Sequence, residues 1–378
     1  MCRGAFCIKM DEKSFAYICN AVAIFLHEYV LLSYSMEGIM KTGITLKGRS
    51  FLTLKDYTTE EILYLLDLAK GLKAKKKKKP YPKNLEGALL EGKNIVLIFD
   101  KTSTRTRCSF EVAAFDEGAQ VTFLTNSQMG KKESIEDTAK VLGRMYDGIE
   151  YRGFEMKVIK DLARHSGVPV WNGLTDDDHP TQVLADFLTV MEHTGKPLDK
   201  MKMAYIGDGR NNVSNALMIG AAKVGMHYSI GAPSELFPSE DLMAELDPIT
   251  KETGSVIEVT TDPFEAVKGA DVIYTDIWVS MGEEDQTASR IALLKGYQVT
   301  MELLKASGNE EVLFEHCLPS FHDLNTTVAR QIHEQYGLTE LEVTDEVFRS
   351  RHSVVFDEAE NRMHTIKAVM VATMSDRL

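Results

Sequence analysis

The chain has 378 residues, of which 44% are hydrophobic and 26% are charged, a balance typical of a soluble globular protein with two domains. Its formal net charge of −13 argues against general binding to nucleic acid, because such binding depends on clustered Lys and Arg side chains. The five cysteines are odd in number and form no C-x-x-C pair, which favours a reducing compartment and predicts a cytoplasmic protein.

The first 44 residues differ in pattern from the remainder of the chain. An apolar stretch at 17–32 is interrupted by His27 and Glu28 and is shorter than the ~20 residues that a membrane-spanning helix needs. Acidic residues precede the stretch and no small-residue cleavage site follows it, which argues against a signal peptide. We interpret residues 1–44 as an appended N-terminal extension, with a later methionine as an alternative start, and expect no membrane association.

From Leu46 onward, short apolar runs alternate with longer helical patterns, which predicts strands joined by crossover helices in parallel sheets. The lysine run at 75–79 stands close to two prolines, and we interpret it as a solvated loop without a catalytic role. A first series of helix, strand, helix, strand and helix is predicted at 59–73, 94–99, 109–117, 121–124 and 133–145.

A long helix predicted at 181–193 connects this series to a second one, and an apolar helix is predicted near the end of the chain at 360–374. The two series together predict an α/β fold with two doubly wound parallel-sheet domains joined by interdomain helices. The active site should lie between the halves, at the carboxyl ends of the strands. Strands of the second series are predicted at 203–206, 227–230, 271–275 and 312–314, with helices at 212–224 and 263–268.

An anion site is predicted directly after the strand at 94–99, where the sequence DKTSTRTRCSF opens a helix. Free N–H groups at a helix start, hydroxyl donors and a guanidinium fork together match the geometry of a phosphate group. Each charge-assisted hydrogen bond contributes on the order of 1.5 to 3 kcal/mol, so several converging bonds could hold a small dianion. The donors are Thr102, Ser103, Thr104, Arg105, Thr106 and Arg107.

Four short motifs follow one another along the chain: STRTR at 103–107, HPTQ at 179–182, DIWVSMG at 276–282 and HCLP at 316–319. They resemble the motifs of the aspartate and ornithine carbamoyltransferases and occur in the order that this family has them. The resemblance extends from about Leu46 to the end of the chain and favours the ornithine branch, although Ser320 stands where the family more often has Ala. It implies transfer of the carbamoyl group of carbamoyl phosphate to the δ-amine of L-ornithine, giving L-citrulline and phosphate in arginine metabolism.

The resemblance also implies a role for individual residues. Gln182 would orient the carbamoyl NH₂ group, and the Leu318 carbonyl would accept a hydrogen bond from the carbamoyl nitrogen. Gln128 would reach into the site of a neighbouring subunit, which predicts shared active sites in a homotrimer. The catalytic residues would be Arg105, His179, Asp276 and Cys317. Carbamoyl phosphate would be bound by Ser103, Thr104, Arg105, Thr106, Gln128, Arg152, His179, Gln182, Cys317, Leu318 and Arg362.

The acceptor amine is expected in the second half. Residues 207–212 look superficially like a dinucleotide-binding turn, but Asn replaces the third glycine and no ribose-binding acid follows, so an NAD-dependent dehydrogenase is a remote alternative. The resemblance assigns ornithine instead to Asn212, with Asn211 beside it, and to Asp276, Ser280 and Met281. We expect a neutral δ-amine as the nucleophile and no covalent intermediate at the Cys317 thiol.

One alternative within the same reaction class is a carbamoyltransferase that acts on putrescine or another amine. Such an enzyme would need no partner for an α-amino and a carboxylate group, so the DIWVSMG loop favours ornithine. No H-E-x-x-H motif or cysteine pair indicates a metal, and we expect neither a metal nor a cofactor. We assign 45–184 plus 355–378 to a carbamoyl phosphate-binding domain and 185–354 to an ornithine-binding domain.

Overall fold

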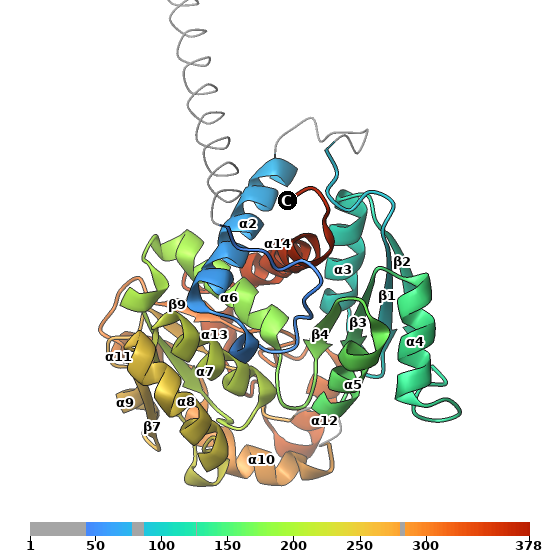
Figure 1. Cartoon of the computed structure of the whole chain (residues 1–378). Helices are drawn as coiled ribbons and strands as arrows, with labels where there is room; N and C mark the ends of the chain where they lie inside the picture. The colour runs from blue at the N-terminus through green and yellow to red at the C-terminus, as the bar shows by residue number, and fades with distance from the viewer. Residues whose placement is uncertain (1–42, 78–86, 126, 280–283) are drawn as a thin grey trace, which may run out of the picture. The chain divides into compact units, whose positions relative to one another are not determined.

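Two separate parallel sheets form the framework of the computed structural model, which describes residues 43–77, 87–125, 127–279 and 284–378 (Figure 1). Residues 45–378 belong to one compact unit, and the interpretation of the N-terminal extension falls almost entirely outside the described residues. None of the helices within the described ranges is long and apolar enough to cross a membrane. The predicted α/β class with two parallel sheets is confirmed.

The first sheet has the strand order β2-β1-β3-β4, and the second has the order β7-β6-β5-β8-β9. Every strand pair is parallel. The chain reverses its direction of winding between β1 and β3 in one sheet and between β5 and β8 in the other, and such switch points leave room for a ligand. The strands are β1 (Asn94–Phe99), β2 (Gln120–Thr125), β3 (Gly148–Arg152), β4 (Val170–Leu174), β5 (Lys202–Ile206), β6 (His227–Gly231), β7 (Ile257–Thr260), β8 (Val272–Tyr274) and β9 (Leu313–Glu315).

The longer helices are α2 (Thr59–Lys77), α3 (Arg105–Asp116), α4 (Ile135–Met145), α5 (Met156–Ser166), α6 (Pro180–Thr194), α7 (Asn212–Val224), α8 (Glu240–Thr253), α12 (Thr327–Tyr336) and α14 (Val355–Met374). The shorter ones are α9 (Pro263–Val267), α10 (Thr287–Leu294), α11 (Met301–Ala306) and α13 (Asp345–Phe348). Helix α14 packs against α2, α3 and α6, so the last helix returns to the first sheet's side of the molecule (Figure 1).

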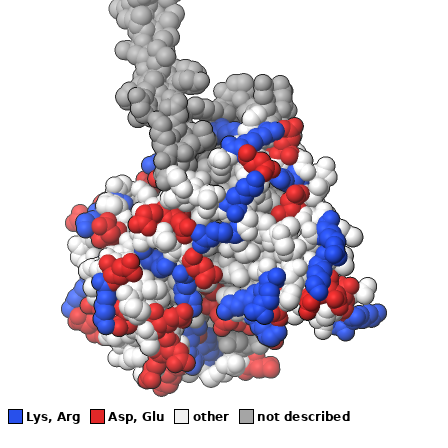
Figure 2. Space-filling view, in the orientation of Figure 1, with Lys and Arg blue, Asp and Glu red and all other residues white. Residues whose placement is uncertain are grey.

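Several predicted elements differ from the observed ones. Strands β3, β4 and β7 and helices α5, α8 and α10 to α13 were not predicted at all. Helix α3 begins at Arg105 rather than at residue 109, so its first turn contains the anion-site motif. The loop interpretation of the lysine run is wrong for Lys75 to Lys77, because these residues end α2 and pair with carboxylates, while residues 78 and 79 lie outside the described ranges. On the visible face, Lys and Arg side chains are mixed with Asp and Glu side chains (Figure 2).

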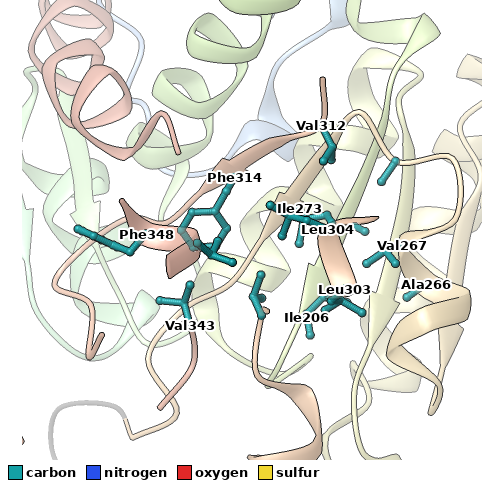
Figure 3. Packing of buried hydrophobic residues seen from close by; sticks show 14 of the residues in the cluster. Ile206, Ala266, Val267, Ile273, Leu303, Leu304, Val312, Phe314, Val343 and Phe348 are labelled. Atoms are coloured by element: carbon teal, nitrogen blue, oxygen red, sulfur yellow. The ribbon is translucent and has the colours of Figure 1, made fainter. Parts of the chain in front are cut away.

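A buried apolar cluster holds the second sheet to the helices beside it. Phe314 of β9, Ile273 of β8 and Val343 belong to it, and all three are fully buried (Figure 3). This packing fixes the carboxyl ends of β8 and β9, because side chains of both strands belong to the same cluster.

We expect the change Val343→Ala to lower the free energy of unfolding by about 2–3 kcal/mol, because it removes buried methyl groups and leaves a cavity. Denaturant unfolding would measure the difference. Val328→Ala makes the same chemical change at an exposed position of α12 and should cost far less. Equal losses for the two variants would contradict the assignment of Val343 to the core.

Candidate functional site

A cavity of about 320 Å³ is lined by residues that follow strands of both sheets. It therefore lies at the predicted edge, where the strand order reverses in each sheet. All predicted site residues line it except Arg107, Gln128, Ser280 and Met281. The lining consists of Lys101 to Thr106, Arg152, Leu174, His179, Gln182, Asn211 to Val213, Asp276 and Ile277, Cys317 to Pro319, and Arg362.

The first wall of the cavity is the N-terminus of α3, which follows β1. The Ser103 hydroxyl accepts a hydrogen bond from the N–H of Thr106 at 3.2 Å, and the Thr104 side chain makes no capping bond. The Thr104 hydroxyl and the positive end of the helix dipole are thus available to an anion. Arg105 donates a hydrogen bond to the carbonyl of Leu318, which joins this wall to the loop after β9.

Arg362 of α14 is the most extensively bonded guanidinium of the cavity. Its Nη1 lies 3.0 Å from Nε2 of His179 and also donates to the side-chain oxygen of Gln182. Its Nη2 donates to the hydroxyls of Thr106 at 3.1 Å and Thr181 at 3.3 Å. One side chain therefore orients groups from α3 and from the start of α6. The Nε of Arg362 is buried and has no partner among the described residues.

His179 is neutral in this arrangement. Burial, followed by the positive charge of Arg362, lowers the pKa of its ring well below the usual range. Because a guanidinium can only donate, Nε2 must accept from Arg362, so the remaining ring nitrogen carries the proton. A neutral imidazole here can act as a hydrogen-bond donor to a substrate carbonyl but not as a fixed cation.

Arg152 adds a further positive charge to the cavity from the end of β3. Burial lowers the pKa of Arg152 and the pKa of Arg362 to about 10, so both remain charged at neutral pH. Arg105 lies near both of them electrostatically. Three guanidinium groups around one small cavity create a local anion site in a chain whose net charge is −13.

The opposite wall presents a carboxylate and a thiol. Asp276 follows β8, accepts a hydrogen bond from the thiol of Cys317 at 3.2 Å, and accepts another from the side-chain amide of Asn211 at 3.0 Å. Burial raises the pKa of Cys317 well above its usual range and raises the pKa of Asp276, so the thiol keeps its proton as a donor. This state fits the expectation that Cys317 forms no covalent intermediate.

Two of the predicted site residues, Arg107 and Gln128, are described but do not line the cavity. The guanidinium of Arg107 pairs with Glu111 and covers the ring of Phe123, so the structure does not place it among the anion donors.

Gln128 is exposed in the loop after β2, and its predicted contact with another subunit remains a prediction. Ser280 and Met281 lie outside the described residues. Asn212 lines the cavity, but its side-chain amide donates to the carbonyl of Thr175 at 2.7 Å.

The sequence predicts Asn211 only as a neighbour of Asn212. In the structure, Asn211 is the residue that contacts Asp276. It caps α7, and its side-chain oxygen accepts the N–H of Val213 while its amide group faces Asp276. Lys101 lines the cavity and pairs with Asp176, and it was not predicted either. Lys101 is the second residue of the sequence DKTSTRTRCSF that follows β1, and its positive charge next to the predicted phosphate donors could have indicated it.

Models of two domains of one family match almost the whole described chain. The "Aspartate/ornithine carbamoyltransferase, carbamoyl-P binding domain" matches residues 49–192, and the "Asp/Orn binding domain" matches residues 199–373. A catabolic ornithine carbamoyltransferase of Clostridium perfringens is 63% identical over 332 residues, which are 88% of this chain and 99% of the relative. A catabolic ornithine carbamoyltransferase of Bacillus licheniformis is 61% identical over 339 residues, with coverages of 89% and 99%.

Solved structures agree with these sequence relatives. The ornithine carbamoyltransferase of Pyrococcus furiosus superimposes with a TM-score of 0.78 at 40% identity, over 88% of this chain and 98% of that one. The enzyme of that name from Gloeobacter violaceus gives 0.73 at 37% identity, over 88% and 100%.

The carboxyl group beside His179 generates a prediction about pH. Burial raises the pKa of Asp178 from 3.8 to about 7, so the folded state binds a proton that the unfolded state releases near pH 4. The contribution of Asp178 to stability is therefore present at low pH and is lost as the pH rises towards 7. Asp178→Asn should become more stable relative to the parent by on the order of 2–3 kcal/mol between pH 5 and pH 8.

Urea unfolding of both proteins at the two pH values would measure this difference. Asp177 is exposed, so Asp177→Asn serves as the control for the loss of one negative charge next to the same helix. A pH-independent difference for Asp178→Asn would show that the carboxyl group is ionised in the folded protein.

Proposed function

Because the chain belongs to the aspartate/ornithine carbamoyltransferase family, we propose that it transfers the carbamoyl group of carbamoyl phosphate to the δ-amine of L-ornithine. The products are L-citrulline and phosphate. The observation that carries the proposal is the cavity itself, which joins three guanidinium groups and a helix N-terminus on one wall to a buried carboxyl group on the other.

Carbamoyl phosphate fits the first wall. Its phosphate is a dianion, and the N-terminus of α3 with Arg105 and Arg152 offers donors and positive charge to it. The carbonyl oxygen becomes an oxyanion as an amine attacks, and stabilisation of that charge requires fixed donors. Arg105, the Thr106 hydroxyl and neutral His179 are the proposed donors, and the hydrogen bonds of Arg362 hold the last two in place.

Ornithine fits the second wall. The carboxylate of Asp276 is the natural partner for an ammonium group, and Asn211 and Cys317 already hold it at two oxygens. We propose Asp276, Asn212, Ser280 and Met281 as the residues that bind the amino-acid head group. Putrescine lacks that head group, so an enzyme for putrescine would have no use for this set of partners.

The proposed reaction needs no group beyond the two substrates. The neutral δ-amine attacks the carbamoyl carbon, the bond between that carbon and the phosphate oxygen breaks, and phosphate leaves with the electron pair. The proton that the amine loses is taken up by the phosphate, so the products are a neutral ureido group and protonated phosphate and the step balances. Because the pKa of such an amine is near that of lysine, the site must favour a minor protonation state, and a cavity rich in guanidinium groups does so.

We propose a cytoplasmic homotrimer in which Gln128 reaches the site of a neighbouring subunit. Within one subunit, Gln128 is exposed and lies away from the cavity that its own chain lines, which supports that role. We propose 45–184 plus 355–378 as the carbamoyl phosphate-binding domain, because α14 packs against α2 and α3 and contributes Arg362. Residues 185–354 would then bind ornithine.

If ornithine is the acceptor, the purified protein should carbamoylate ornithine to citrulline far faster than it carbamoylates putrescine or aspartate. Carbamoyl phosphate is the donor in all three reactions. Phosphate release and a colorimetric ureido assay would follow all three reactions. Faster turnover of putrescine would keep the carbamoyl phosphate site and overturn the assignment of ornithine. The absence of turnover with every amine would refute the proposed activity.

Shared sites predict complementation between two inactive variants. Arg105→Ala should lower kcat by about 10² to 10³ through the loss of an oxyanion donor, and Gln128→Ala should lower activity at a different position of the same site. In trimers formed from a 1:1 mixture, roughly a quarter of the sites combine an intact Arg105 with an intact neighbouring Gln128. Co-expression should therefore restore activity to roughly a quarter of the wild-type value.

Arg107→Ala is the control for the arginine change. Arg107 lies on the same helix but pairs with Glu111 and covers the ring of Phe123 outside the cavity. It should keep activity within about threefold, because its side-chain partners Glu111 and Phe123 do not line the cavity. A mixture no more active than the sum of its two components would rule out shared sites.

A further inference from the structure

The side-chain amide of Gln182 is held from behind by two buried carboxyl groups. Its Nε2 donates to Oδ1 of Asp186 at 2.7 Å and to Oε1 of Glu358 at 2.8 Å. Its oxygen accepts from Arg362 on the cavity side. Asp186 and Glu358 do not line the cavity themselves, and both are at most 1% exposed.

Glu358 also connects this amide to the second sheet. Its Oε1 accepts from the hydroxyl of Tyr274 in β8 at 3.2 Å, and its Oε2 accepts from the backbone N–H of His316 directly after β9 at 2.9 Å. The next residues of that loop are Cys317 and Leu318, which line the cavity. One carboxyl group on α14 therefore touches both a side chain of α6 and the loop that faces it across the cavity.

We propose that the buried pair Asp186 and Glu358 fixes the amide of Gln182 with its oxygen towards the cavity, and ties this orientation to the strand end that carries Cys317 and Leu318. Both are positioning residues, because neither touches the cavity. The inference rests on the proposed function only in that the oxygen of Gln182 would then accept from the NH₂ group of carbamoyl phosphate.

The distribution of protons in the pair supports a fixed orientation. Both buried carboxyl groups accept from the same Nε2 of Gln182, so two negative charges would lie close together without water and one group is expected to keep its proton. Among the described residues, Glu358 accepts from Gln182, Tyr274 and His316, whereas Asp186 accepts from Gln182 only and its Oδ2 has no partner, so Asp186 is the better place for that proton. Burial raises the pKa of Asp186 well above its usual range, in agreement with this assignment.

The two members of the pair should therefore respond differently to amide substitution. Asp186→Asn replaces a protonated carboxyl by a group that can still accept from Gln182 and donate to Glu358. Glu358→Gln places an NH₂ group in a position surrounded by N–H and O–H donors, so in either orientation of the new amide one donor meets another. The hydrogen bonds around the amide of Gln182 then no longer favour one orientation over the other.

Glu315→Gln is the matched control. Glu315 is another fully buried glutamate near the same pair, but neither of its oxygens has a hydrogen-bond partner within the described part of the chain. It bears the same chemical change at the same burial without a bond to Gln182. Thermal unfolding of each variant would report any general loss of structure.

The experiment measures equilibrium binding of carbamoyl phosphate and of inorganic phosphate to the full chain without an amine, together with kcat and KM for citrulline formation. We expect Glu358→Gln to weaken carbamoyl phosphate by about tenfold or more relative to phosphate and to lower kcat by a similar factor. Asp186→Asn and Glu315→Gln should stay within about threefold in both measurements. Asp186→Ala should behave like Glu358→Gln, which keeps the test available if one variant fails to fold.

Equal binding ratios for Glu358→Gln and the parent would overturn the inference, as would an Asp186→Asn variant as impaired as Asp186→Ala. Failure of the wild-type protein to turn over ornithine would refute the proposed function alone. The ratio of the two affinities would still report the orientation of Gln182, because it involves no acceptor amine.

Discussion

The remainder of the site depends on the hydrogen bonds of the Arg362 guanidinium group. It bonds to Thr106 at the start of α3, to His179 and Gln182 at the start of α6, and it enters from α14 near the end of the chain. Three segments far apart in the sequence are thus held by one planar fork of donors, whose geometry leaves little freedom to its partners. The neutral state of His179 follows directly from this contact and from burial.

The site balances charge within a small buried volume. Arg152 and Arg362 are almost completely buried, and so are the carboxyl groups of Glu150, Asp186 and Glu358 behind them. Burial raises the pKa of each of these three carboxyl groups, because the charged form is costly without water. The cavity therefore stays positive towards a ligand, since a carboxyl group that takes up a proton no longer offsets the charge of the guanidinium groups.

The sequence predicted the elements whose apolar runs are uninterrupted. The predicted limits of strand β1 and helix α7 equal the observed ones, because a polar motif marks one end of each element. Strands β3 and β4 were missed because residues that are not apolar interrupt their runs. Glu150 is buried in β3, and a side chain at Gly173 of β4 would collide with the carboxyl group of Glu150. The motifs identified the lining residues, but Asn211 could not be chosen over Asn212 without the direction in which each side chain points.

The position of Arg362 in the chain has a consequence for biosynthesis. A growing polypeptide leaves the ribosome from its N-terminus, and domains generally fold as they emerge. The strands and loops that supply Thr106 and His179 can assemble early, but their common guanidinium partner is carried by α14, the last helix of the described chain. A nascent chain thus acquires a complete anion pocket only after residues 355–374 have been synthesised, because a shorter chain lacks both Arg362 and the buried helix that packs against α2, α3 and α6.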